Sequence, residues 1–85
     1  MLTVKAMKGR AIPLKNIKLL IEGNGQITLG RIGPIRCAAV AADEDQQLAA
    51  LVRRRGESLE NLLVRLDAAI EAAWEKEMFL DEING

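Results

Sequence analysis

The chain has 85 residues, of which 49% are hydrophobic, and its 12 basic and 12 acidic residues give zero formal net charge. A chain of this length forms one domain with a modest core. Because it has no histidine or tyrosine, one serine and one cysteine, it excludes Ser-His and Cys-His nucleophilic pairs and the usual zinc sites. We therefore expect no enzyme, no catalytic residues, no cofactor and no metal.

The first half of the chain predicts short antiparallel strands. Apolar and polar residues alternate over residues 2–6 and again over 17–21, which is the period of a half-buried strand. Apolar residues resume at 27–29, after the stretch "EGNGQ". A three-residue loop over 23–25, with Gly25 left-handed, would pair Ile21 with Ile27 and Leu19 with Leu29 and keep the apolar side chains on one face.

A turn and a further strand are expected next. "RIGPIR" predicts a tight turn, and "IRCAAVA" predicts a strand of small residues. Cys37 lies in this strand, where we expect it to act as a small buried hydrophobe rather than a reactive thiol. A lone cysteine excludes an intramolecular disulfide and fits a reducing compartment.

The pattern becomes helical at Asp43. Asp43 and Gln46 have the spacing of a capping box, and Leu48, Leu51 and Val52 form a narrow helical stripe. Gly56 then predicts a left-handed stop. The three arginines at 53–55 would occupy the last turn of this helix, where cations complement the helix dipole. We interpret them as a helix end in preference to a nucleic-acid contact.

The clearest predicted element is a helix over residues 59–77, capped by Ser58. Eight apolar residues fall within an arc of about 140° on this helix: Leu59, Leu62, Leu63, Leu66, Ala69, Ile70, Ala73 and Trp74. This stripe is either core or contact surface. An acidic flank beside it is predicted to face the basic sheet or a basic partner, and it consists of Glu60, Asp67, Glu71 and Glu75.

These elements predict an α+β fold, with a small antiparallel sheet of three to four strands in the N-terminal half. Two helices follow and pack on the sheet, the second long and amphipathic. Residues 1–78 would form the single domain, and residues 79–85 an apolar and acidic C-terminal tail. The lysines near the start and the short apolar runs predict a cytoplasmic protein without a membrane partner.

The distribution of charge indicates either attraction between the two halves of the folded chain or interaction with nucleic acid or an oppositely charged protein. Residues 1–42 hold seven basic residues and one acidic residue, whereas residues 43–85 hold five basic and eleven acidic residues. The wide apolar stripe, the short chain and the apolar tail flanked by acids predict a small protein-interaction module that binds itself as a homodimer, or another protein. The candidate contact residues are Leu59, Leu62, Leu63, Leu66, Ile70, Trp74, Phe79, Leu80 and Ile83.

The alternative is an antitoxin-like DNA-binding regulator with a basic N-terminal half and an acidic, partner-binding C-terminal half. Its candidate nucleic-acid contacts are Lys5, Lys8, Arg10, Lys15 and Lys18. "KGRAIPLKNIK", residues 8–18, resembles the loop and strand of swapped-hairpin, AbrB-like DNA-binding domains, with one residue fewer between Gly9 and the Ile-Pro pair. Nucleic acid is not favoured, because both aromatic residues, Trp74 and Phe79, lie in the acidic half and leave the sheet without a stacking platform.

Overall fold

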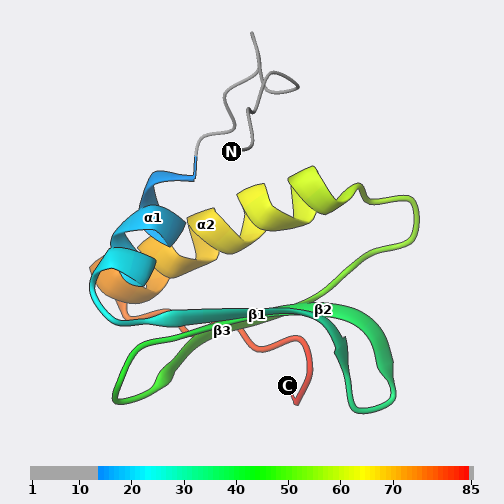
Figure 1. Ribbon diagram of the computed structural model, residues 1–85, viewed down its shortest axis with the longest axis horizontal. Helices are drawn as coiled ribbons and strands as arrows, with labels where there is room; N and C mark the ends of the chain where they lie inside the picture. Colours follow the sequence, from blue (N-terminus) through cyan, green and yellow to red (C-terminus); the bar gives the residue numbers. More distant parts are fainter. Residues whose placement is uncertain (1–13, 85) are drawn as a thin grey trace, which may run out of the picture.

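The computed structural model describes residues 14–84 and has the predicted α+β architecture. Three antiparallel strands form one sheet in the order β1-β2-β3, and two helices pack against it. Figure 1 shows both helices on one side of the sheet. The elements in chain order are α1 (Lys15–Glu22), β1 (Gln26–Ile32), β2 (Ile35–Ala42), β3 (Gln47–Val52) and α2 (Leu59–Lys76). One helix therefore precedes the sheet, and the predicted strand at residues 2–6 lies outside the described residues.

The core lies between the sheet and the helices. It is built from alanines and two leucines on the strands and from leucines, an isoleucine and alanines on α2. The largest fully buried side chains are Leu48, Leu51, Leu62, Leu66 and Ile70. Alanines of β2 and β3 leave room for these large residues, so α2 can approach the sheet closely.

The strand predicted at residues 17–21 is wrong, because these residues belong to α1. The alternation placed Leu19 and Ile21 inside, but both are exposed, and the buried positions are Asn16 and Leu20. This spacing of four residues is that of a helix. The strand implied by the resemblance to swapped-hairpin domains is also absent at Lys15–Lys18, where α1 begins.

The helix predicted to start at Asp43 is also wrong, because residues 47–52 form β3. β3 lies between β2 and the C-terminal segment, and four consecutive residues, Leu48 to Leu51, are buried. A strand buried on both faces shows a continuous apolar run that resembles a helical stripe. Asp43 does accept N–H bonds from Asp45 and Gln46, both at 2.8 Å, but it closes the loop between β2 and β3 instead of starting a helix.

The turns around β1 were predicted in part. The tight turn of "RIGPIR" is confirmed: Ile32 pairs with Ile35, and Gly33 adopts a φ of 57°. At residues 23–25 the left-handed residue is Asn24, not Gly25. Glycine is required at position 25 for a different reason, because a Cβ there would collide with the side chain of Leu20.

Helix α2 is confirmed, with both of its ends close to the prediction. The Oγ of Ser58 accepts the N–H of Asn61 at 3.0 Å, and Glu77 ends the helix in the left-handed conformation. The chain then returns along β3, where Ala50 N–H donates to Leu80 O and Ala50 O accepts the N–H of Glu82. This C-terminal segment therefore lies along the edge of β3 that does not pair with β2.

Candidate functional site

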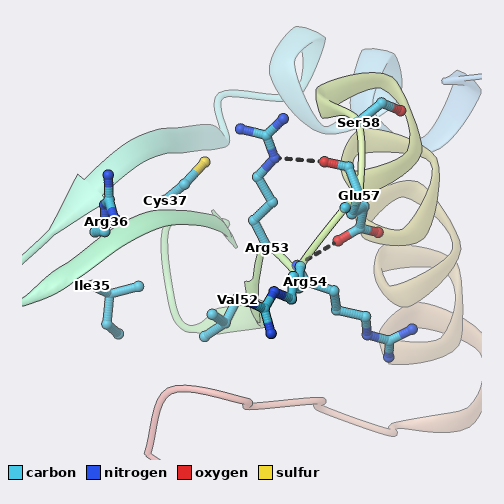
Figure 2. Close-up of a pocket in the computed structure, with 10 residues that line it drawn as sticks. Ile35, Arg36, Cys37, Val52, Arg53, Arg54, Glu57 and Ser58 are labelled. Carbon is cyan, nitrogen blue, oxygen red and sulfur yellow. Dashed lines mark hydrogen bonds between the residues drawn. The ribbon is translucent and has the colours of Figure 1, made fainter.

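A cavity of about 790 Å³ opens where β2 begins, β3 ends and the loop to α2 starts. Its lining consists of Ile35, Arg36, Cys37, Val52 and the loop 53–58. Antiparallel pairing brings these segments together, because Ala38 pairs with Val52 and the N–H of Arg53 donates to Cys37 O at 3.0 Å. Figure 2 shows Arg36, Cys37 and Arg53 around this space.

Four of the lining residues are arginines, and the one carboxylate among them is Glu57. Its Oε1 accepts the N–H of Arg54 at 2.9 Å and Nη2 of Arg65 at 3.0 Å, while Oε2 accepts Nε of Arg65 at 2.8 Å. The hydrogen bonds from the Arg65 side chain, followed by that from the Arg54 backbone, lower the pKa of Glu57 to about 2. Because Arg65 lies outside the lining and compensates Glu57, the cavity keeps an excess of positive charge.

The arginines of the cavity differ in how they are held. Arg53 donates from Nε to Glu57 O at 2.7 Å, as Figure 2 shows. Arg54 has an Nη2 to Glu82 Oε2 separation of 3.7 Å, with a well-exposed side chain. Among residues 14–84, no carboxylate lies within ion-pair distance of Arg36, Arg53 or Arg55.

Arg65 connects three separate parts of the fold. It donates to the carboxylate of Glu57, to Val52 O at 3.0 Å and to Glu82 Oε2 at 3.0 Å. Glu82 in turn accepts the N–H of Val52 at 2.9 Å. These bonds fix the C-terminal segment and the loop before α2 relative to the end of β3. The sequence carries no local signal for them, since Arg65 and Glu82 are 17 positions apart.

A second feature is a buried polar contact between the two helices. The Oδ1 of Asp67 accepts the backbone N–H groups of Asn16 and Ile17, both at 2.8 Å. The Nδ2 of Asn16 donates to Asp67 Oδ2 and to Glu71 Oε1, both at 3.0 Å. Asp67 thus caps α1, whose own N-cap residue, Leu14, makes no side-chain cap bond. Part of the acidic flank of α2 therefore faces α1, not the basic sheet.

The candidate contact residues fall into two groups. Leu62, Leu66 and Ile70 are fully buried in the core and so are unavailable to a partner, and Leu63 and Ile83 are partly buried. The exposed members are Leu59, Trp74, Phe79 and Leu80.

Sequence reasoning missed three further exposed apolar residues near the helix ends: Leu19, Ile21 and Met78. The first two were missed because residues 17–21 were assigned to a strand.

The candidate nucleic-acid contacts are only partly described. Lys15 and Lys18 are exposed on α1, while Lys5, Lys8 and Arg10 lie outside the described residues. The arginines at 53–55 lie in the loop after β3, which corrects their interpretation as the end of a helix. They are nevertheless close to a helix, because α2 begins directly after this loop.

Comparison with known proteins adds no relative: no protein-family model, curated protein or solved structure matches the chain. Within residues 14–84, no helix has the length and apolar composition needed to cross a bilayer. The features that bear on function are therefore the cavity, the exposed apolar residues and the charged side chains of the chain.

Acid is expected to weaken the contacts of Glu57. The pKa of Glu57 is about 2 in the folded chain, below the ordinary value of 4.5. Because the pKa of Glu57 is lower in the folded chain than in the unfolded chain, ionised Glu57 stabilises the fold at any pH above the ordinary pKa of 4.5. This stabilisation is lost as the pH falls from 4.5 toward the folded pKa of about 2. Urea unfolding of wild type and Glu57→Gln should therefore differ most at neutral pH and converge between about pH 4.5 and pH 2. Glu44→Gln, in the exposed loop before β3, is the control, and an equal convergence there would contradict the prediction.

Proposed function

We propose that this protein is a cytoplasmic, non-enzymatic interaction module that binds a second copy of itself. The observation that supports this most is a group of large apolar side chains left in solvent, here called the terminal apolar surface. Its members are 42% to 58% exposed: Leu19 and Ile21 of α1, Trp74 of α2, and Met78, Phe79 and Leu80 of the segment after α2. Large exposed apolar groups gathered in one region are typical of interaction sites.

The fold brings together the two helices that carry Leu19, Ile21 and Trp74. α1 packs against α2, and Figure 1 shows α1 beside the C-terminal half of α2. Trp74 lies in the last turn of α2, and Met78 to Leu80 follow directly after the helix. Tryptophan and other aromatic residues are enriched among the residues that dominate binding energy. Trp74 and Phe79 are therefore the proposed anchors of the contact.

The charges near this surface favour a second copy as the occupant. α1 carries the exposed bases Lys15 and Lys18 against one exposed acid, Glu22, whereas the end of α2 carries the exposed acids Glu75 and Glu77 against one exposed base, Lys76. In a two-fold interface the same patch is used by both copies, so a contact of α1 with the α2 end of the other copy occurs twice. The lysines of each copy then lie opposite the glutamates of the other copy, on both sides of the two-fold axis. This charge complementarity supports pairing between identical chains.

The experiment is sedimentation of the full chain across a concentration series. Wild type is expected to dimerise, and Trp74→Glu to raise the dimer dissociation constant about 100-fold or more, because it places a charge against an apolar anchor. Val64→Glu is the matched control, since Val64 is also exposed on α2 but lies outside the terminal apolar surface. Circular dichroism would verify that both variants fold. A wild-type chain that stays monomeric at high micromolar concentration, or equal effects of both variants, would contradict the proposal.

The second candidate, an antitoxin-like DNA-binding regulator, is supported by the sequence charge split and by Arg36 and Arg53–Arg55 around the cavity. Positively charged side chains attract the phosphates of the DNA backbone whatever the base sequence is. Retention of duplex DNA in a low-salt gel shift, lost in the double variant Lys15→Gln and Lys18→Gln, would favour this function. The homodimer remains the first proposal, because it draws on six exposed apolar residues that DNA binding does not use.

A further inference from the structure

We propose that the arginine cavity binds a small ligand that carries two or more phosphate-type anionic groups. This goes beyond the homodimer, because the cavity lining shares no residue with the terminal apolar surface. The cavity is formed where β2, β3 and the loop before α2 meet, with four lining residues on the strands and six on the loop.

The lining of the cavity carries an excess of positive charge. Arg36, Arg53, Arg54 and Arg55 stand against Glu57, whose carboxylate is bonded by Arg65 from outside the lining. Charges of one sign in a concave surface focus the electrostatic potential and raise the local concentration of oppositely charged ligands. Guanidinium groups also present paired N–H donors that match phosphate oxygens.

Three of these guanidinium groups also have N–H groups that donate to no acceptor within residues 14–84. Arg36 and Arg55 make no side-chain hydrogen bond or ion pair within residues 14–84, and Arg53 donates there from Nε alone. Arg36 comes from the start of β2 and Arg55 from the loop after β3. Donors from two segments can contact two anionic groups of one ligand, which favours a polyphosphate-type compound over a single small anion.

The volume and lining of the cavity limit the size and kind of ligand that it can hold. The volume of about 790 Å³ lies within the range of small-molecule sites. The lining has no aromatic residue on which a nucleic-acid base could stack, although stacking is the usual basis of single-strand binding. Ile35, Cys37 and Val52 add an apolar part to the wall. A compact anion, with or without an apolar portion, therefore fits this cavity better than a nucleic-acid strand.

The experiment is calorimetric titration of the full chain with sodium tripolyphosphate and, separately, ATP, in a low-salt chloride buffer. We expect both to bind, and Arg36→Gln and Arg55→Gln each to weaken binding about tenfold, since each removes a charged hydrogen-bond donor. Arg31→Gln is the matched control, because Arg31 is exposed on β1 and lies outside the lining. Trp74→Glu should bind as wild type does, which separates this proposal from dimerisation.

A second readout uses Cys37, the single cysteine of the chain, which is partly buried and lines the cavity. Saturating tripolyphosphate is expected to slow alkylation of Cys37 by iodoacetamide, a neutral reagent, in wild type and less so in Arg36→Gln. The proposal is overturned if neither anion binds, if Arg31→Gln weakens binding as much as Arg36→Gln, or if a DNA oligonucleotide binds while tripolyphosphate and ATP do not.

Discussion

Replacing Asp67 with alanine is expected to lower the free energy of unfolding by about 3 kcal/mol, a large part of the stability of a small domain. Asp67 is 7% exposed and accepts three N–H groups of α1, two from the backbone and one from the Asn16 side chain. Its removal leaves these donors unpaired in a buried place, and it removes the negative charge at the start of α1. We therefore expect α1 to detach or fray before the rest of the fold.

Chemical denaturation of Asp67→Ala and of Glu75→Ala, an exposed acid on the same helix, measures the effect against a control. Glu75→Ala is expected to change stability by about 0.5 kcal/mol or less. Amide exchange should be faster in α1 of the Asp67 variant, while α2 and the strands stay protected. Equal losses of stability in the two variants, or an unchanged α1, would show that Asp67 does not hold this helix.

The contact between Asp67 and α1 illustrates which parts of the fold the sequence could predict. α2 was predicted because its signals are local: Ser58 precedes it, and its apolar residues repeat with helical spacing over five turns. α1 has eight residues, and the carboxylate that caps it lies 51 positions away from Asn16 in sequence. A short helix with a distant cap has no local start signal. The alternation of residues 17–21 therefore predicted a strand where the chain forms a helix.

β3 was missed for a related reason. Leu48, Leu51 and Val52 are spaced as on a helix, but the alanines between them are small enough to be buried on a strand. What makes residues 47–52 a strand is pairing on both sides, with β2 and with Leu80 to Glu82 of the C-terminal segment. Neither partner can be identified from the residues of the strand itself, because β-propensity depends strongly on neighbours.

The candidate sites also differ in whether local sequence signals or distant contacts define them. The sequence identified Phe79 and Leu80 because these large apolar residues lie outside the helical stripe, and it identified Trp74 as a member of that stripe. It did not identify the arginine cavity, because Arg36 and Arg53 come together only through the pairing of β2 with a strand that was assigned to a helix. Once β3 is a strand, the three consecutive arginines follow a strand and line a concave surface.

The apolar stripe of α2 combines two roles that one pair of substitutions can separate. Leu66→Ala is expected to lower the free energy of unfolding by about 3 kcal/mol, because Leu66 is fully buried and its truncation leaves a cavity. Trp74→Ala should lower the stability of the monomer less than Leu66→Ala does, because Trp74 is 42% exposed whereas Leu66 is fully buried. It should also weaken self-association, because Trp74 is the proposed anchor of the dimer.

Urea denaturation at a concentration below the dimer dissociation constant measures the first effect, and sedimentation measures the second. Val64→Ala, an exposed position on the same helix, is the control for both and should change stability by about 0.5 kcal/mol or less. If Leu66→Ala disrupted association without loss of stability, the stripe would be contact surface along its whole length. If Trp74→Ala destabilised the monomer as much as Leu66→Ala, Trp74 would belong to the core, and the terminal apolar surface would lose its proposed anchor.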